Sequence, residues 1–556
     1  MGPSADAVAE ARALAVTATP IVASYLLSYG CALVMLMLVG HVSVEALAAV
    51  ALATMFQNAS GVAIIMGTAN ACDTLCSQAF GAGNAARVGL VARRGVAIAL
   101  ATAVPVAMVW GLGARAFFTA LGIERATADA AAAYLRVLIA GLPAFLFVEV
   151  LKKPLISVNL PGVAMALSLA PLAASVFFGV ILVHGAGLGY LGAAWASVAA
   201  SWFGAAAFCA FFRNHRAVGA ATRAAAAALG GVSLAGGGGA LLDDAAHATL
   251  DAVFPAAAAS FAGVFDATGW REYLAIGVPS AAMLVAEWGS YEALAILAGR
   301  LGTAPLAAHS IFASTATLSF MPFLGLSVAA CVRVGAALGG GRASAARLTL
   351  RVALAGSVAL FTANAIVVVA VRGFWGEVFT GDEAVVDVVA RGLPIIALYT
   401  VFDGTQCVLA GVLRGAALAA PAAAINVIAY LSGLALAAGL SEGAGWGLTG
   451  IWLAFVLAVF VAALLMFLVL QTRDWDGLAA RASAAAASAA GDAAREDKGA
   501  AAPAAAAAAA EVEAPGGAIA AGAGAGAEAE AEAEAEAAAA SPWDTRQPVA
   551  APVVWA

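Results

Sequence analysis

Long apolar segments recur along most of the chain, and short polar connections separate them. Twelve of these segments hold about 20 residues or more, the length that an α-helix needs to cross the roughly 30 Å hydrocarbon core of a bilayer. They lie near residues 16–39, 46–70, 90–112, 130–151, 155–183, 189–212, 273–298, 305–330, 348–371, 385–412, 418–440 and 447–471. The pattern predicts an all-α membrane protein with twelve transmembrane helices.

Composition agrees with this pattern. The 556 residues are 64% hydrophobic and 11% charged, and their mean hydropathy is +0.98, far above that of a soluble globular protein. The formal net charge is −7, but 13 acidic and only 4 basic residues lie from Asp474 onward. The part before this tail is therefore nearly neutral. No motif in it indicates an enzyme or a partner nucleic acid.

The segments divide the chain into five regions. These are an N-terminal cytoplasmic segment (1–15), an N-terminal six-helix lobe (16–216), a cytoplasmic linker (217–268), a C-terminal six-helix lobe (269–472) and a cytoplasmic tail (473–556). The linker contains "GGGG" at 236–239, but it lacks the preceding strand and following Lys-Ser/Thr of a phosphate loop, so we expect a flexible connection. The tail includes "AEAEAEAEAEAAAA" and has too few large apolar residues for a core, so we expect disorder.

The two lobes resemble each other at a spacing near 258 residues. "QAFGAGNAARVG" at 78–89 matches "AALGGGRASAAR" at 336–347, and "GYLGAAW" from Gly189 matches "GLTGIW" from Gly447. Each repeat contains six spans, an even number, so both cross the membrane in the same sense. This predicts two pseudo-symmetric six-helix lobes with a cavity between them.

Basic residues in the short connections indicate the orientation. Those on one side are Arg87, Arg93, Arg94, Lys152, Lys153, Arg213, Arg216, Arg223, Arg342, Arg347 and Arg414, whereas the other side has mainly Arg115, Arg125, Arg300 and Arg372. Because basic loops stay in the cytoplasm, both termini should be cytoplasmic. No cleavable signal is recognisable at the N-terminus, and a plasma membrane or a vacuole-type membrane would fit equally.

Three acids lie within apolar spans. Glu287 and Glu292 occur in "MLVAEWGSYEALAIL", and Asp403 occurs in "LYTVFDGTQCVLAGVLRG". A carboxylate at mid-membrane depth costs at least about 2.5 to 3.5 kcal/mol, so each is a candidate functional residue. Glu292 follows Glu287 by five residues, a rotation of about 140° around a helix, so the two cannot face one cavity equally well.

A carboxylate in a low-dielectric cavity can release a proton and take up a cationic substrate or Na⁺ in its place, which is the minimal chemistry of an antiporter. Polar residues at helical spacing are candidates to line the path, and aromatic faces attract organic cations. These candidates are Tyr291, Tyr399, Gln406, Asn426 and Tyr430. The predicted partners are a small organic substrate and the lipid bilayer, with H⁺ or Na⁺ as the coupling ion. No other cofactor and no metal site is predicted.

Each candidate has a purely structural alternative. The three acids could simply hydrogen-bond neighbouring helices, and His309 lies near a helix start, where a lone histidine is usually structural. Glu149 could form a local ion pair with Lys152 or Lys153 near the cytoplasmic end of its span. The six cysteines lack paired metal-ligand spacing and are expected to be apolar filler.

Five stretches of the sequence carry a family resemblance. They are "LMLVGHVSVEALAAVALATMFQNASG", "MGTANACDTLCSQAFGAG", "AEWGSYE", "SFMPFLGLSVAACVRVGAALGGG" and "FDGTQCVLAGVLRG". Together they resemble the multidrug and toxic compound extrusion (MATE) transporters, most of all the eukaryotic branch. The similarity extends from about residue 16 to 472 and leaves out the linker and the tail.

The resemblance implies a twelve-helix fold, alternating access, and efflux of organic compounds in exchange for H⁺ or Na⁺. It assigns the working acids to Glu287 and Glu292 of "EWxxxE" and to Asp403. Many bacterial relatives carry an Asp in the first span, and this chain has none there. Two further departures are Ser77, where Gly is usual, and Ser157, where Gln is usual.

Taken together, these features predict a monomeric secondary active antiporter, not an enzyme, that exports organic cations or other xenobiotic or metabolite compounds. One alternative is a lipid-linked sugar flippase of the same superfamily, which would need several cationic residues facing a groove. Another is a non-transporting membrane scaffold or receptor whose tail binds partners. Mutation of Glu287 and Asp403 would leave a scaffold unaffected.

Overall fold

The computed structural model describes residues 4–228, 244–253 and 263–486. Within these ranges the chain is helical apart from short turns, and it contains no strand. Twelve helical segments of the described chain are long and apolar enough to cross a membrane. A helix satisfies its own backbone hydrogen bonds, which a span surrounded by lipid requires. The predicted fold class is therefore confirmed, although the first span begins at Ala5, well before the predicted residue 16.

Short π or 3-10 segments interrupt several spans, so that α2, η1 and α3 together form the one span Glu45–Gly81. The N-terminal half contains α1 (Ala5–Gly40), α2 (Val44–Gln57), η1 (Asn58–Val62), α3 (Ala63–Gly81), α4 (Ala85–Met108), η2 (Val109–Gly113), α5 (Ala114–Ala120), α6 (Arg125–Leu138), η3 (Ile139–Gly141), α7 (Leu142–Ser157), α8 (Pro161–Gly179), η4 (Val180–Gly185) and α9 (Gly189–Ala228). The remainder contains α10 (Asp244–Val253), α11 (Ala267–Arg300), α12 (Thr303–Gly339), α13 (Ala343–Val371), η5 (Gly376–Val378), α14 (Glu383–Gly415), α15 (Ala419–Ala438), η6 (Gly439–Gly443) and α16 (Gly447–Gln471).

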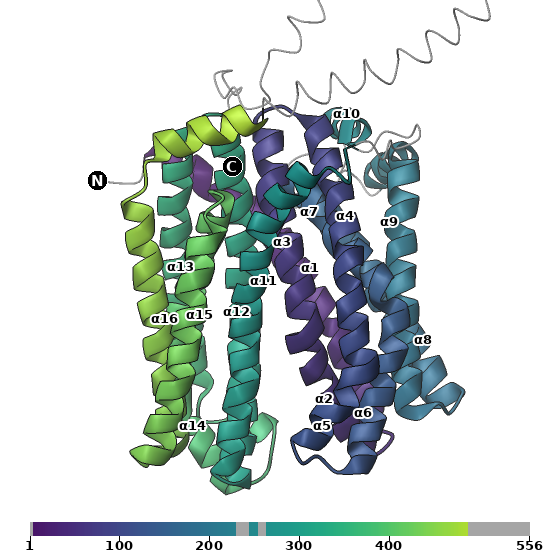
Figure 1. The fold of residues 1–556 in the computed structure, drawn as a ribbon, viewed down its shortest axis with the longest axis vertical. Helices are drawn as coiled ribbons and strands as arrows, with labels where there is room; N and C mark the ends of the chain where they lie inside the picture. Colours follow the sequence, from purple (N-terminus) through teal and green to yellow (C-terminus); the bar gives the residue numbers. More distant parts are fainter. Residues whose placement is uncertain (1–3, 229–243, 254–262, 487–556) are drawn as a thin grey trace, which may run out of the picture. The chain divides into compact units, whose positions relative to one another are not determined.

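Figure 1 shows the spans in two groups, and the twelve spans of the described chain divide between them as six before and six after α10. In the N-terminal lobe, α8 packs against α1 and α9, and α7 packs against α3 and α4. In the C-terminal lobe, α14 packs against α12, α13 and α16, and α15 packs against α11. The lobes meet where α1 and α3 contact α12 and where α3 contacts α11.

The backbone repeats itself at the spacing that the sequence predicts. Positive φ angles occur at Gly83 and Gly341, and again at Asn159 and Ala417, and the members of each pair are 258 residues apart. The pairs Gly187/Gly445 and Gly189/Gly447 also have positive φ angles and the same separation. Equivalent turns therefore end and begin equivalent helices in the two lobes, which confirms their pseudo-symmetry.

Glycines allow the lobes to approach closely at one end of the molecule. A Cβ on Gly339 of α12 would clash with the backbone of Gln78 on α3, and one on Gly81 would clash with the backbone of Ala336. At the same end, the Gln78 Nε2 donates to the carbonyl oxygen of Gly415 at 3.0 Å, and the Thr74 hydroxyl donates to that of Arg414 at 2.9 Å. Side-chain-free backbone contact of this kind packs helices tightly without a hydrophobic driving force.

A larger residue at Gly339 should open this end. In Gly339→Val, the added side chain has no space against α3, so we expect the two lobes to separate there. Cys76 and Cys331, both fully buried near this contact, should then react faster with N-ethylmaleimide, as measured by mass spectrometry. Gly356→Val on α13, where a Cβ would make only an ordinary contact, is the matched control. Equal labelling of wild type and Gly339→Val would contradict this account.

The region predicted as linker contains ordered helix. The helix α9, which begins at Gly189 as a membrane span, extends as far as Ala228, with a break in its helical geometry at Asn214. His215 hydrogen-bonds His247 of α10 at 3.0 Å and Asp251 at 3.1 Å. Arg216 also donates to Asp251, and this bond lowers the pKa of that carboxyl below its ordinary value. The predicted "GGGG" at 236–239 lies outside the described residues.

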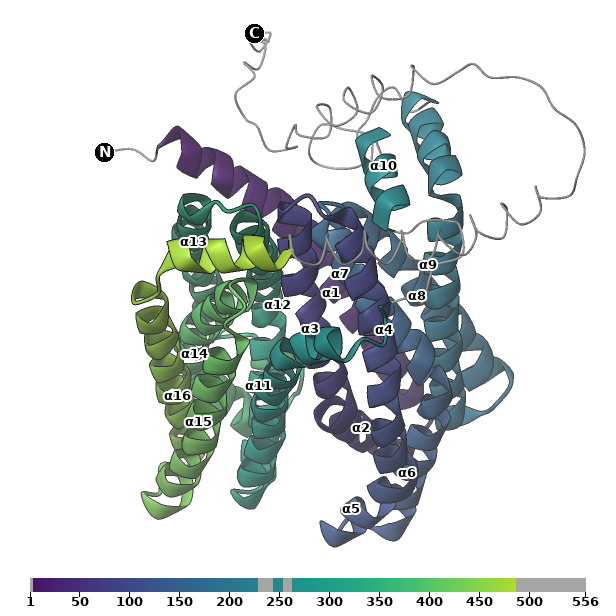
Figure 2. The same cartoon turned by 45° about the horizontal axis from the view of Figure 1, so that its top comes forward.

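The first part of the predicted tail is also ordered. Residues 475–486 form a helix, here termed the bridging helix, which Figure 2 shows in yellow-green running from the end of α16 towards the N-terminal lobe. Trp475 and Leu478 are buried against the C-terminal lobe, and Arg87 of α4 donates to the carbonyl oxygen of Ala485. The expectation of disorder from residue 473 is therefore wrong for this stretch, because the apolar side of a short helix finds a packed partner. The rest of the tail lies outside the described residues.

Candidate functional site

The interior of the C-terminal lobe brings two of the three predicted acids together. Glu287 on α11 is 7% exposed and Asp403 on α14 is 3% exposed, and the two lie close enough for their charges to interact. The helix between them is α15, which contacts both α11 and α14. Its Asn426 lies beside Glu287, and its Tyr430 hydroxyl donates to Asp403 Oδ1 at 3.2 Å.

Tyrosines enclose the acid pair. Tyr399, one turn before Asp403 on α14, also lies close to that carboxylate. Its hydroxyl is 2.5 Å from that of Tyr291 on α11. The Trp452 ring stands edge-on to Tyr399 at 5.4 Å and packs against Tyr291 at 6.5 Å. The predicted lining tyrosines thus form one aromatic enclosure, whose faces suit an organic cation.

The two predicted amides complete the same region. Gln406 Nε2 donates to Asn426 Oδ1 at 2.6 Å. The other polar atoms of these amides, Gln406 Oε1 and Asn426 Nδ2, are buried and have no hydrogen-bond partner within the described chain. Buried polar atoms are usually satisfied, so an unpartnered pair beside two acids indicates a place for a polar ligand, an ion or water.

Glu292 does not join this group. It is only partly buried and forms no ion pair or side-chain hydrogen bond within the described residues. The five-residue spacing from Glu287 turns it to another face of α11, as expected from helix geometry. Any role of Glu292 would therefore be played outside the enclosure that surrounds Glu287 and Asp403.

Arg414 is a residue whose location the sequence analysis misjudged. It was expected in a cytoplasmic connection, but it is 5% exposed near the end of α14 and donates to the Ser327 hydroxyl at 3.2 Å. Its charge reaches Glu287, although no ion pair joins Arg414 to either acid in the described chain. Its position eleven residues after Asp403, about three turns further along the same face of α14, was the available signal.

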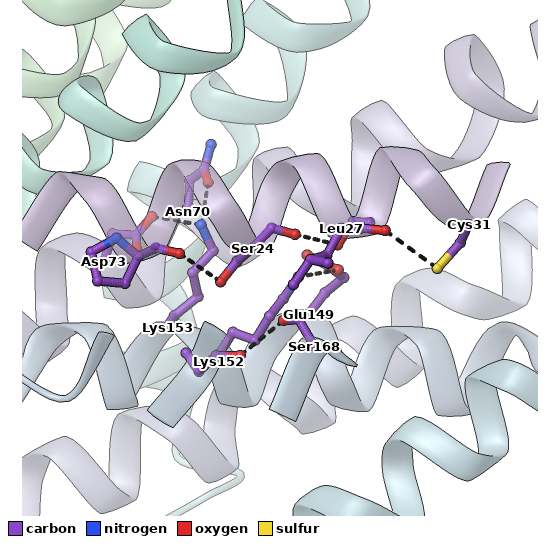
Figure 3. Close-up of polar contacts among 12 residues, drawn as sticks. Ser24, Leu27, Cys31, Asn70, Asp73, Glu149, Lys152, Lys153 and Ser168 are labelled. Carbon is purple, nitrogen blue, oxygen red and sulfur yellow. Dashed lines mark hydrogen bonds and ion pairs between the residues drawn. The ribbon is translucent and has the colours of Figure 1, made fainter. Parts of the chain in front are cut away.

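A second buried charge cluster lies in the N-terminal lobe (Figure 3). Lys153 on α7 forms a 2.7 Å ion pair with Asp73 on α3 and donates to Asn70 at 3.1 Å. Lys152 forms a 2.6 Å ion pair with Glu149. The local ion pair of Glu149 is therefore confirmed, but the placement of both lysines in a cytoplasmic connection is wrong. Ion pairing compensates their burial, a tertiary effect that hydropathy along the chain cannot reveal.

The two lobes thus differ in their electrostatics. In the N-terminal cluster each acid has a lysine partner, so the cluster is neutral. In the C-terminal enclosure the carboxylates of Glu287 and Asp403 have tyrosine and amide neighbours and no ion pair within the described chain. Of these two clusters, the C-terminal pair is the one whose carboxylates have no ion-paired base in the described chain, so they can take up a proton or another cation.

The remaining marked residues are placed as follows. His309 is 2% exposed, and its ring packs against Trp452 at 5.6 Å, while its Nδ1 has no partner in the described chain. The Ser77 hydroxyl donates to the carbonyl oxygen of Thr74 at 3.0 Å. Ser157 Oγ is buried without a hydrogen-bond partner among the described residues. Within the same residues, no three His, Cys, Asp or Glu side chains gather as a metal site.

Comparison with known proteins shows which family this chain resembles. The model of the MatE family matches residues 20–181 and 279–438, one segment in each lobe. Protein DETOXIFICATION 51 of Arabidopsis thaliana is 30% identical over 485 residues, which cover 86% of this chain and 83% of that protein. Multidrug and toxin extrusion protein 2 of Mus musculus is 27% identical over 486 residues, covering 86% and 77% respectively.

Solved structures agree with these sequence relatives. The crystal structure of the eukaryotic MATE transporter AtDTX14 matches with a TM-score of 0.76 at 24% identity. The match covers 86% of this chain and 100% of that chain. At this identity the likeness shows a shared fold, including the arrangement of both six-span lobes.

Proposed function

The chain belongs to the MatE family of membrane transporters, and from this premise we propose that it is a secondary active antiporter that exports organic compounds in exchange for H⁺. Organic cations and other xenobiotic or metabolite compounds are the proposed substrates. The printed names of its relatives, which speak of detoxification and of multidrug and toxin extrusion, support this substrate class. These relatives are transporters, consistent with a protein that catalyses no reaction.

The observation that carries the proposal is the buried acid pair. Glu287 and Asp403 lie within interaction range of each other, without an ion-paired base in the described chain, inside an enclosure of tyrosines. Two neighbouring carboxylates cannot both carry a charge cheaply in a low-dielectric interior. Binding of a proton or of a cationic substrate relieves this repulsion, so the proton and the substrate compete for the same carboxylates.

The proposed cycle uses this competition. From the cytoplasmic side, the ionised acids bind the substrate, and the aromatic faces of Tyr291 and Tyr399 hold its apolar part. After the lobes rearrange, protons from the opposite side bind the acids and release the substrate. The close glycine contact between α3 and α12 supports a state that is sealed at that end. A ligand drives such a rearrangement only through different affinities for the two states.

Other parts of the proposal follow from the same premise. Na⁺ could replace H⁺ at the acid pair without a change in geometry, since both neutralise carboxylate charge. We propose a monomer in a plasma membrane or a vacuole-type membrane, with both termini in the cytoplasm. The arginines at the sealed end, such as Arg87, Arg342 and Arg347, support that orientation.

Uptake into liposomes tests the coupling. We expect the purified protein to drive uptake of a fluorescent organic cation into proteoliposomes when a pH gradient is imposed. Uptake should collapse when a protonophore removes the gradient. A Na⁺ gradient without a pH gradient is the parallel arm. Uptake with Na⁺ alone would overturn H⁺ coupling, and uptake that ignores both gradients would overturn antiport.

The alternative of a lipid-linked sugar flippase is not favoured by the described residues. Such a protein would offer unpaired cations along a groove to bind phosphate-linked sugars. Lys152 and Lys153 are both buried in the N-terminal lobe, and both are paired with acids. They therefore present no positive charge for such a substrate.

A further inference from the structure

A pocket separate from the proposed transport site lies between α13 and α16 of the C-terminal lobe. It encloses a cavity of about 420 Å³ between α13, the end of α16 and the start of the bridging helix. Its lining comprises Arg347, Leu350, Arg351, Leu354, Phe467, Leu470, Gln471, Arg473 and Trp475. Neither Glu287 nor Asp403 contributes to it. The proposed antiport cycle therefore leaves this pocket unexplained.

The polar part of the lining is basic. Arg347 forms a 2.9 Å ion pair with Asp476, an exposed pair that leaves other N–H groups of the guanidinium available. Arg351 and Arg473 are exposed and make no ion pair or side-chain hydrogen bond within the described residues. Three guanidinium groups thus line one pocket, and among the described residues only Asp476 forms an ion pair with one of them. Guanidinium groups bind phosphate oxygens in bidentate fashion.

The apolar part of the lining has a definite direction. Arg347, Leu350, Arg351 and Leu354 share one face of α13, and the face becomes apolar as the helix enters the membrane. On α16, Phe467 lies one turn deeper in the membrane than Gln471. The pocket is therefore basic where the helices end and apolar further along the spans. A free phosphate ion would use only the basic end.

We propose that this pocket binds the headgroup of an anionic phospholipid, with the phosphate among Arg347, Arg351 and Arg473 and an acyl chain along Leu354 and Phe467. Basic pockets between transmembrane helices are suited to such headgroups. The buried Trp475, 5% exposed, also lines the pocket, just after the end of α16, and aromatic residues favour the membrane interface.

Lipid binding would also act on the bridging helix. Arg473 lies two residues before that helix and Trp475 begins it, and the far end of the helix accepts hydrogen bonds from Arg87 and Asn84 of the N-terminal lobe. A lipid that holds the beginning of the helix in place therefore stabilises a connection between the lobes. This effect does not depend on whether the transported substrate is an organic cation.

Native mass spectrometry of the intact protein tests the proposal. The protein in detergent would be titrated with dioleoyl phosphatidic acid and, in parallel, with dioleoyl phosphatidylcholine. We expect selective binding of phosphatidic acid, and a loss of about tenfold or more in the double variant Arg351→Gln/Arg473→Gln, since each arginine near an anionic surface contributes roughly a factor of five. The double variant Arg372→Gln/Arg481→Gln changes the charge equally at exposed sites outside the pocket and should bind as wild type does.

Three results would overturn the proposal. The first is equal binding of phosphatidic acid and phosphatidylcholine, and the second is an equal loss of phosphatidic acid binding in the two double variants. The third is displacement of phosphatidic acid by millimolar inorganic phosphate, with the protein binding the phosphate in its place. The last result would assign the pocket to a free phosphate. A melting curve in detergent for each variant confirms that the substituted arginines have not changed the fold.

Discussion

Replacing Glu287 by glutamine is expected to reduce proton-driven export to the level of protein-free liposomes while the protein still folds. Glutamine keeps the shape of the side chain, so the contacts with Asn426 and the packing of α11 can remain. It cannot release a proton, however, and it removes half of the negative charge that attracts a cation. If Glu287 and Asp403 act as a pair, loss of either should abolish coupling and not merely weaken it.

The measurement is uptake of a fluorescent organic cation driven by an imposed pH gradient, with substrate binding to the same variant measured separately. Asp403→Asn should behave like Glu287→Gln. Glu292→Gln should retain more transport, because Glu292 lies outside the tyrosine enclosure. Glu377→Gln, at an exposed acid outside the spans, is the control. Wild-type rates in Glu287→Gln would remove this residue from the mechanism.

Replacing Lys153 by methionine is expected to cause the largest loss of stability, about 3 to 5 kcal/mol, because it leaves a buried acid without its partner. Lys153 is 3% exposed, and its ammonium group is 2.7 Å from Asp73. Methionine fills a similar volume, so the cost arises mainly from the uncompensated charge of Asp73 and from the lost bond to Asn70. Unfolding in mixed micelles of increasing denaturing detergent measures the change.

A double variant separates charge from packing. Asp73→Asn/Lys153→Met removes both charges and should recover most of the lost stability, since a buried ion pair replaced as a whole is often close to neutral. Arg391→Met, which breaks the exposed pair with Asp387, should change stability by no more than about 0.5 kcal/mol. A double variant as unstable as Lys153→Met alone would show that packing, not charge compensation, explains the loss.

These two sites differ in how far the sequence could predict them. Glu287 and Asp403 stand out because an acid within an apolar run is costly wherever the run lies, and this is a property of the segment itself. Their shared enclosure with Tyr399 and Tyr430 follows from α15 packing against both α11 and α14. The spacing of residues along one helix could suggest which of them share a face, but it could not predict that α11, α14 and α15 pack against one another.

Lys152 and Lys153 show the opposite case. Two adjacent lysines at the end of an apolar segment are typical of a cytoplasmic connection, and hydropathy therefore places them outside the membrane. The partner of Lys153 is Asp73, which lies 80 residues earlier, on α3. Since the free energy of burying a charge depends on its partner, local spacing could suggest the pair of Lys152 with Glu149 but not the pair of Lys153 with Asp73.

By itself, the sequence determined the twelve spans and the candidate acids, because both follow from the free energy of placing short segments in lipid, and the 258-residue repeat, because similar motifs recur at that spacing. Only the tertiary structure decided which side chains share an interior: it separated Glu292 from Glu287, buried Arg414 and the two lysines, and held residues 475–486 against the lobes. Those outcomes depend on pairing between helices far apart in the chain, which contributes nothing to the hydropathy of either helix alone.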